Sequence, residues 1–410
     1  MAQAVQGSSQ PAYELRRDRL VWIITLGHMA VHWFQQIWPV VIAAIRQDLG
    51  LSNVELGLVS SVKQFTTAPF MFPAGILADF ARRRTALILG GSVVAFGIAY
   101  ALVSRASSHL WLVLAVSLLG IGTVLWHPTA TGALSKRYPD RRASALAIHG
   151  TGASISDTIS PIALGVLLTL LGWRHLLVLM FIPATLIGFA LWRALESTYR
   201  SEAPTRLTLR AYLGDVRSMM RHRIVLAIIG VNVCTSLAAL ATLTFLPVYL
   251  KEDLGYSNFL LGVHIALLYA MGAISQPILG RLSDRYGRKA VLLPSLILFG
   301  LFYLAMAPAD HGVQLGIVVG ALGLFFYALA TVTQAAVMDV ASDRVQASTM
   351  GVTSLIAQLI TLPSPIIAGI IVNHWGPKGA FVYSGVIVLV GAVLLALIKV
   401  PRTGRKAAVA

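Results

Sequence analysis

Long apolar runs separated by short polar segments fill most of the chain. A helix needs roughly 20 apolar residues to cross the hydrocarbon core of a bilayer. We identify twelve runs of about that length, and an even count puts both chain ends on one side of a membrane. The runs fall at about residues 20–45, 54–78, 85–104, 109–132, 143–170, 173–193, 224–249, 257–280, 290–308, 312–337, 347–372 and 379–399. The pattern predicts an all-α polytopic membrane protein with twelve transmembrane helices.

The composition excludes most soluble classes of protein. Of the 410 residues, 57% are hydrophobic and only 12% are charged, whereas a soluble domain carries about 25% charged residues. So little charge cannot cover a water-facing surface, which argues against a soluble enzyme, a disordered chain and a secreted disulfide scaffold. The single cysteine, Cys234, falls in a predicted helix, where a buried apolar role is more common than redox chemistry.

The net charge of +16 is divided unevenly between the loops on the two sides. Twenty-six of the 32 lysines and arginines fall in the loops that share a side with both termini, five fall in the other set, and Lys63 lies inside the second run. Loops rich in lysine and arginine stay in the cytoplasm. We therefore expect a multi-pass inner (plasma) membrane protein with both termini in the cytoplasm, and no nucleic acid partner. No cleavable signal peptide is evident.

An internal repeat divides the chain into two halves. Residues 48–84 align without a gap to residues 253–289, with 12 identities in 37 positions. Parallel repeats of this kind place a binding site between the halves, near the middle of the membrane. We expect a first six-helix bundle at residues 1–193, a cytoplasmic linker at 194–223 and a second six-helix bundle at 224–410.

A loop motif occurs at the same place in both halves. Residues 280–289 read Gly-Arg-Leu-Ser-Asp-Arg-Tyr-Gly-Arg-Lys, and residues 75–84 hold a degenerate copy. Glycine permits close approach of helices, and an aspartate at the membrane edge can accept hydrogen bonds from a helix N-terminus or an arginine. We therefore expect a conformational latch. Its residues are Gly75, Asp79, Arg83, Gly280, Asp284, Arg285, Gly287 and Arg288.

This motif and the repeat resemble the major facilitator superfamily (MFS), whose signature loop reads G-x-L-x-D-R-x-G-R-K. The resemblance implies the MFS fold and transport by alternating access. The first copy departs from the signature at Phe80 and Arg82, so its latch is expected to be weaker. Three stretches, at residues 27–28, 120–128 and 141–152, resemble the fosmidomycin-resistance group of drug exporters more closely.

Ionisable residues inside a membrane are costly, so each is a candidate for function. His28, His32 and Gln35 follow a spacing of i, i+4 and i+7 in the first run, which puts them on one helix face. We expect this stripe to face a water-filled cavity. The spacing of the two histidines also fits a metal pair, but without a supporting cysteine we predict no metal site, and metal transport remains only an alternative.

Lys63 and Asp157 lie in the outer part of the second and fifth runs. One interpretation is structural, with each forming a salt bridge to the other or to another polar group. The functional interpretation has Asp157 take up a proton while Lys63 attracts an anionic group or alternates as its partner. Further candidates for the substrate or proton pathway are His127, His149, Asn232, Gln334 and Gln358, although hydrogen bonding and helix packing explain each of them equally well.

We predict a secondary transporter, not an enzyme, that moves a small organic solute across the inner membrane by alternating access. Proton-coupled efflux of a drug-like or anionic compound is the first choice, and uptake by proton symport is the alternative. A non-transporting membrane sensor is an alternative from another class, but it leaves the two loop motifs without a reason. The sequence has no nucleotide-binding loop, so we expect no cofactor, the proton gradient as driving force, and a monomer with substrate, protons and lipid as partners.

Overall fold

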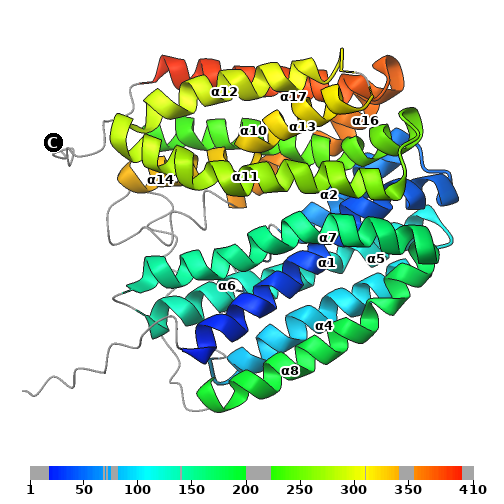
Figure 1. Ribbon diagram of the computed structural model, residues 1–410, viewed down its shortest axis with the longest axis vertical. Helices are drawn as coiled ribbons and strands as arrows, with labels where there is room; N and C mark the ends of the chain where they lie inside the picture. Colours follow the sequence, from blue (N-terminus) through cyan, green and yellow to red (C-terminus); the bar gives the residue numbers. More distant parts are fainter. Residues whose placement is uncertain are drawn as a thin grey trace, which may run out of the picture.

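The computed structural model describes residues 18–67, 70, 73–74, 82–138, 141–199, 223–309, 311–340 and 355–398. The described residues form two helical bundles that lie side by side, with the N-terminal half below and the C-terminal half above in Figure 1. The first helix begins and the last helix ends at the same end of the molecule, which we call the termini end. We call the opposite end the far end.

The N-terminal half holds seven described α-helices. They are α1 (Arg19–Leu49), α2 (Asn53–Phe65), α4 (Thr85–Val103), α5 (His109–Ser117), α6 (Leu119–Arg137), α7 (Arg142–Leu179) and α8 (Phe181–Tyr199). Ser52 and Glu55 form a reciprocal capping box that fixes the start of α2, because each side chain bonds a backbone N–H that would otherwise lack a partner. The chain turns between α1 and α2 at Gly50, which has a positive φ of 62°.

The C-terminal half has the same plan. Its helices are α10 (Arg223–Val248), the π-helical turn Tyr249–Asp253, α11 (Asn258–Tyr286), α12 (Arg288–Ala305), α13 (Val313–Phe326), α14 (Ala328–Val340), α16 (Ser364–Trp375) and α17 (Lys378–Leu397). Nine described helices, counted across short breaks, are long and apolar enough to cross a membrane. The arrangement confirms the predicted fold class of twelve transmembrane helices in two six-helix repeats.

One predicted boundary is kept as a bend and another differs from the structure. The stretch Arg142–Leu179 (α7) holds the fifth run and the start of the sixth, and Gly172 bends the backbone between them with a φ of 70° and a ψ of 164°. The rest of the sixth run lies in α8. The last helix of the first half continues to Tyr199, beyond the predicted bundle boundary at residue 193. The predicted linker at 194–223 therefore begins within α8, and its residues 200–222 lie outside the described part of the chain.

The internal repeat is visible in the backbone itself. Gly50 and Gly255 have φ angles of 62° and 64°, and Gly172 and Gly376 have φ angles of 70° and 71°. Gly50 and Gly255 lie in or beside the aligned stretches 48–84 and 253–289 at a separation of 205 residues, and Gly172 and Gly376 continue the repeat at a separation of 204. A positive φ favours glycine, so within each pair the glycines that align in sequence also make the same turn in both halves.

The halves meet at the far end through glycines. Position Gly57 of α2 faces the backbone of Pro365, and its repeat partner Gly262 of α11 faces the backbone of Pro161. A second pair behaves alike, with Gly165 of α7 against Asn258 and Gly369 of α16 against Asn53. Helix backbones approach this closely only when no side chain intervenes. The contacts α2 with α16 and α7 with α11 are therefore related by the same pseudo-twofold symmetry as the sequence repeat.

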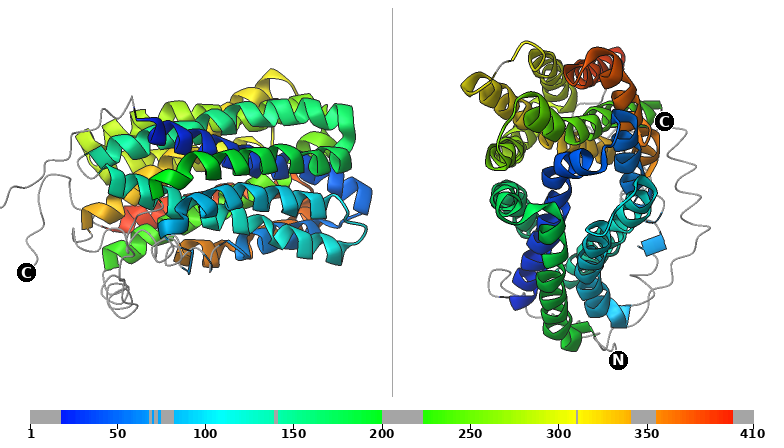
Figure 2. Two further views of the ribbon diagram at one scale, coloured as in Figure 1. Left: turned by 90° about the horizontal axis from the view of Figure 1, so that it is seen from below. Right: turned by 90° about the vertical axis from the view of Figure 1, so that its right-hand side faces the viewer.

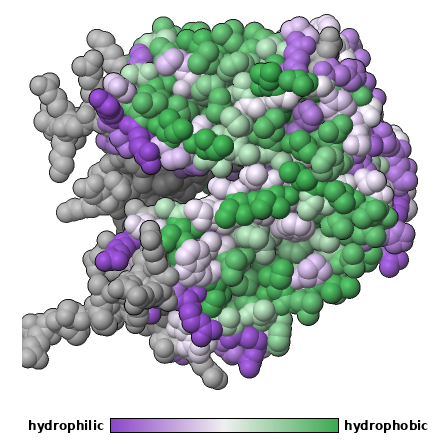
Figure 3. Space-filling view, viewed as in Figure 1, coloured by the Kyte–Doolittle hydropathy of each residue, from purple (hydrophilic) through white to green (hydrophobic). Residues whose placement is uncertain are grey.

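Polar side chains add to this far-end contact. Arg46 pairs with Glu252, Asn53 donates to Asn373 at 2.8 Å, and Gln64 donates to Gln358 at 3.3 Å. Figure 3 shows the surface hollowed between the two halves toward the termini end, and Figure 2 shows the two bundles from the far end in its right panel. The molecule is thus closed at the far end.

Candidate functional site

One side of α1 carries polar side chains toward α6 and α7. His28, His32 and Gln36 are spaced one helical turn apart, so they share a face. Their hydrogen-bond partners on α7 come 121 to 125 residues later in the chain. The site therefore depends on how three helices of the first half pack, and we name it the α1–α6–α7 site.

Asp157 of α7 is the acceptor that connects two of the α1 side chains in the α1–α6–α7 site. The carboxylate accepts hydrogen bonds from His32 Nδ1 at 3.0 and 3.1 Å and from Gln36 Nε2 at 2.7 Å. Asp157 is only 6% exposed, so these donors replace the water that the carboxylate loses on burial. Of the pairings considered for Asp157, the structure shows the one with another polar group and not the one with Lys63.

Four histidines, His28, His32, His127 and His149, form a cluster in the same place. The rings of His28 and His149 stack in parallel with centroids 3.8 Å apart, and His28 Nδ1 donates to the His149 carbonyl oxygen at 2.9 Å. The ring of His127, from α6, lies 5.3 Å from that of His28 and 5.8 Å from that of His32. The sequence predicts all four residues as candidates, but it places only His28 and His32 together on one helix face.

The polar stripe on α1 is less open than the sequence predicts. His28 is 6% exposed and His149 is 3% exposed, so α6 and α7 cover much of what we expected to face a water-filled cavity. Gln35 turns to α6, where it donates to Thr123 Oγ1 at 3.0 Å. His32 and His127 remain partly exposed. The reason is that α1 packs closely against both partner helices, which the spacing of its own residues does not reveal.

Lys63 lies in the last turn of α2 and is half-buried. Its Nζ is 5.9 Å from the centroid of the Trp38 ring, a distance at which an aromatic face attracts a cation. The helix C-terminus also favours positive charge. Within the described part of the chain, no carboxylate forms an ion pair with Lys63. Among the described residues, its charge is therefore compensated by an aromatic ring and a helix dipole.

The candidates in the second half do not form a second cluster. Asn232 is partly buried in α10, Gln334 is exposed on α14, and Gln358 bonds to Gln64 of the first half. Sequence reasoning missed two aromatic residues that reach the α1–α6–α7 site. The rings of Tyr269 of α11 and Tyr327 are tilted against each other with centroids 5.1 Å apart, and both lie near enough to Asp157, across the boundary between the halves, for its charge to affect them.

Gln36 was also missed, although a signal for it existed. It follows His32 by four residues, so it belongs to the same helix face as the two histidines. The predicted stripe runs from His32 to Gln35 instead. For Tyr269 and Tyr327 no such signal exists, because tyrosines in an apolar helix are common and only packing between the halves brings these two to Asp157.

The loop between α11 and α12 is organised by Arg288, the first residue of α12. Its guanidinium donates to Asp284 at 2.5 Å, to Ser283 at 3.0 Å and to Asp339 of α14 at 2.7 Å. A planar guanidinium can serve several acceptors at once. The loop is thereby tied to α14 within the second half. Gly287 precedes it with a φ of 98°, a backbone region that favours glycine.

The other latch residues differ from expectation or lie outside the structure. Around Gly280, no described atom lies within 4 Å of an added Cβ, so the predicted close helix approach is absent there. Arg285 lies over the Tyr286 ring, with its guanidinium carbon 5.3 Å from the centroid. Arg83 is exposed. Gly75 and Asp79 fall outside the described residues.

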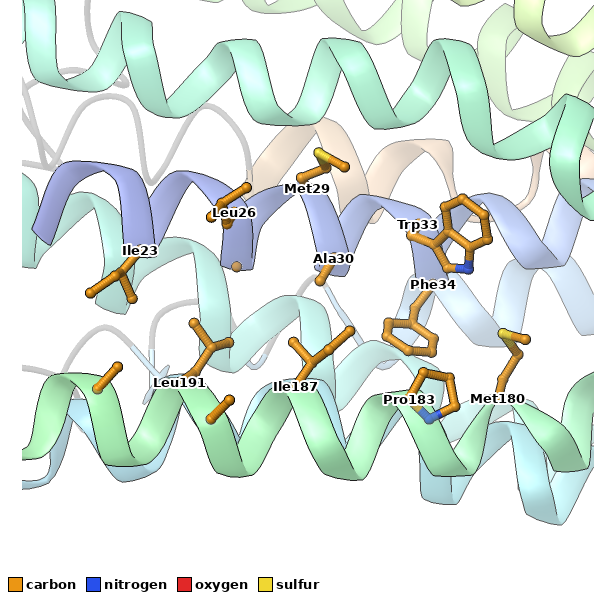
Figure 4. A pocket seen from close by; sticks show the side chains of 13 residues that line it. Ile23, Leu26, Met29, Ala30, Trp33, Phe34, Met180, Pro183, Ile187 and Leu191 are labelled. Atoms are coloured by element: carbon orange, nitrogen blue, oxygen red, sulfur yellow. The ribbon is translucent and has the colours of Figure 1, made fainter. Parts of the chain in front are cut away.

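A separate, apolar cavity of about 540 Å³ lies between α1 and α8 (Figure 4). Trp33 and Phe34 approach Met180 and Pro183 at one end, and Ile187 lies near its middle. By spacing, its lining residues on α1 occupy a different face from His28 and His32. Sequence reasoning did not find this cavity, because any apolar run can form one.

The chain belongs to the Major Facilitator Superfamily. The family model matches residues 21–275 and 232–410, which together span nearly the whole chain and overlap across the middle. Membership in this family of transporters makes the protein a membrane transport protein and not an enzyme. It also confirms the family to which the loop motif and the repeat pointed.

Curated relatives of the chain are transporters. It is 26% identical over 85% of its length to a probable sulfoacetate transporter of Cupriavidus necator, covering 86% of that protein. It is 27% identical over 72% of its length to a probable nitrate/nitrite antiporter of Thermus thermophilus, covering 68% of it. It is 25% identical over 83% of its length to a multidrug resistance protein of Erwinia billingiae, covering 83% of it.

Solved structures share the fold at low identity. A bacterial homologue of the human lysosomal transporter Spinster, in an inward-facing and occupied conformation, matches with a TM-score of 0.74 and 18% identity, over 95% of this chain and 97% of that one. The nucleoside transporter NupG matches with a TM-score of 0.73 and 14% identity, over 93% and 100%. The closer resemblance to the fosmidomycin-resistance group stays a prediction.

Proposed function

We propose that this transporter exports a small organic compound with an acidic group, driven by the proton gradient. The observation that carries the proposal is Lys63, a half-buried cation whose described surroundings hold an aromatic ring but no paired carboxylate. A charge at membrane depth is costly unless something compensates for it. An anionic substrate supplies the missing charge when it enters between the halves.

Two of the relatives support an anionic substrate. They are named for sulfoacetate and for nitrate and nitrite, all of which are anions, whereas the multidrug resistance relative supports efflux. We infer from the positive-inside rule that the termini end is cytoplasmic. The structure, closed at the far end, then corresponds to an inward-facing state that can load a cytoplasmic compound. We place the protein in the inner membrane as a monomer.

The direct test is counterflow in proteoliposomes with a panel of small organic acids and neutral analogues. Lys63→Gln should reduce transport of the anions at least tenfold, because the neutral side chain no longer attracts them, while neutral analogues are unaffected. Lys378→Gln is the matched control, since Lys378 begins α17 at the far end of the other half. Equal anion transport by wild type and Lys63→Gln would overturn the assignment of Lys63.

The driving force and the direction need a second experiment. Inverted membrane vesicles energised with a proton gradient should accumulate the compound, and a protonophore should abolish the accumulation. Uptake by proton symport is the second candidate, and it predicts the opposite, with cells that express the protein accumulating more compound than cells that lack it. A membrane sensor would bind the compound without moving it, so absence of flux in both assays would favour that class.

A further inference from the structure

Three imidazoles from two helices converge in the α1–α6–α7 site. His28 and His32 come from α1 and His127 comes from α6, and one ring nitrogen of each lies within 4.8 Å of one from each of the others. We call these three residues the histidine triad. His149 belongs to the wider cluster but stacks flat on His28 at 3.8 Å, so the two rings cannot direct their nitrogens at one point between the triad.

The hydrogen bonds of His28 and His32 leave one ring nitrogen of each residue free to bind a ligand. His28 Nδ1 must carry a proton, because it donates to the His149 carbonyl oxygen. His32 Nδ1 likewise donates to the Asp157 carboxylate. In both residues the Nε2 atom therefore holds a lone pair in the neutral ring.

His28 supplies a second, independent observation. The residue is 6% exposed, and its Nε2 has no hydrogen-bond partner among the described residues. A buried polar atom without a partner costs free energy. A ligand that accepts this lone pair would remove that cost, and a metal ion is such a ligand.

Asp157 completes the pattern typical of metal sites. Metal-binding histidines usually donate their second ring N–H to a carboxylate or a backbone carbonyl, which fixes the tautomer and the ring orientation. His32 makes the first kind of contact and His28 makes the second. Gln36 in turn holds Asp157 at 2.7 Å. Histidines that only fill space would not need these hydrogen bonds to a carbonyl, a carboxylate and the glutamine behind it.

We propose that the histidine triad binds a divalent first-row transition-metal ion, with Zn²⁺ as the reference ion. Imidazole nitrogen suits zinc, copper, iron and nickel, whereas calcium and magnesium prefer oxygen. Zn–N bonds of about 2.0–2.1 Å in a tetrahedron put ligand atoms about 3.3 Å apart. The triad therefore contracts by small ring rotations when the ion binds.

Three protein ligands leave a fourth position open, as in metal sites that also bind a small molecule. His32 and His127 are partly exposed, so this position is on the accessible side of the triad. The inference goes beyond the proposed function and does not rest on it, because ion binding is measured without any transport. It revises the prediction from sequence that the chain has no metal site, since the sequence revealed only the His28 and His32 pair.

The test is equilibrium binding of Zn²⁺ to the full-length protein in detergent micelles, purified with a tag that contains no histidine and stripped with a chelator. Wild type should bind one ion per chain. His28→Gln, His32→Gln and His127→Gln should each weaken binding at least tenfold, and Asp157→Asn should weaken it about 10–100-fold, as loss of an outer partner does elsewhere. Co²⁺ should give the visible bands of a four-coordinate site with three nitrogen ligands.

His264→Gln is the matched control. His264 is buried in α11, and its Nδ1 bonds to Leu260 of its own helix, so its loss should leave the affinity unchanged. Equal weakening by this control, or no stoichiometric binding by wild type, would overturn the proposal.

A second measurement needs no substitution and so avoids variants that fail to fold. Zn²⁺ should protect the triad of the wild-type protein from carbethoxylation, read out by mass spectrometry, and should leave the exposed His175 unprotected. If the three triad histidines react as fast with Zn²⁺ as without it, the triad is not a metal site.

Discussion

At the scale of single residues, the α1–α6–α7 site is a set of buried polar groups held by named partners. Asp157 accepts from His32 and Gln36, and both donors come from the same face of α1. In a membrane these partners cannot be replaced by water, so each hydrogen bond matters for stability as well as for function. Such a network fixes the position of α1 against α7.

Removing the carboxylate should therefore destabilise the protein. Asp157→Leu leaves His32 and Gln36 without their acceptor, which should lower the free energy of unfolding by about 1–3 kcal/mol. Asp157→Asn keeps one carbonyl oxygen as acceptor and should cost less. Thermal unfolding in detergent measures both variants, and a Leu variant as stable as wild type would show that the network contributes nothing.

Arg288 makes a comparable prediction for the loop between α11 and α12. Its guanidinium serves Asp284, Ser283 and Asp339 together, and lysine cannot reproduce that planar geometry. Arg288→Lys should reduce transport several-fold while the amount of protein in the membrane stays the same. The exposed Arg83 is the control. Both substitutions keep the positive charge, so a similar loss in Arg83→Lys would mean that the effect is not specific to the hydrogen bonds of Arg288.

At the scale of helices, glycines decide where the two halves can touch. Gly57, Gly165, Gly262 and Gly369 each face the backbone of a helix in the other half, and Gly57 and Gly165 repeat at Gly262 and Gly369. Because of the repeat, the α2–α16 contact and the α7–α11 contact have the same glycine arrangement. Each half supplies one glycine-bearing helix to each contact, so the far end closes symmetrically.

A larger side chain at these positions should hold the far end open. Gly262→Leu introduces atoms where the backbone of Pro161 lies, so the closed state should become less populated. Cross-linking of the pair Asn53→Cys and Asn373→Cys, whose native side chains are 2.8 Å apart, measures closure. Gly316→Leu is the control because its site is open, and equal cross-linking in both variants would contradict the model.

At the scale of the whole molecule, the protein is closed at the far end and hollowed toward the termini end. At the far end, the halves are connected by the pair Arg46 and Glu252 and by the pair Asn53 and Asn373. Exposed pairs contribute little individually, so the closed state can break and reform during a cycle. Alternating access requires that reversibility.

Locking the far end should stop the cycle. A disulfide between Asn53→Cys and Asn373→Cys should abolish transport under oxidation, and reduction should restore it, because the compound can no longer leave on that side. Each single cysteine variant serves as a control and should transport in both conditions. Transport that continues in the oxidised double variant would show that the far end does not need to open.

The sequence alone determined the architecture of this protein. Hydrophobic run length, the distribution of lysine and arginine, and the repeat of residues 48–84 at 253–289 are patterns along one dimension, and bilayer thickness translates them directly into helices and halves. Even the paired turns at Gly172 and Gly376 follow from aligned glycines.

The tertiary structure alone decided which polar residues meet. Helix periodicity places His28, His32 and Gln36 on one face, but it says nothing about the rotation of α6 and α7 against that face. Helix packing set that rotation and placed His127 beside His28 and His32. It also paired Asp157 with His32 and placed Lys63 near the Trp38 ring. Contacts between residues about 90 to 125 positions apart depend on how helices pack, and no local pattern contains that information.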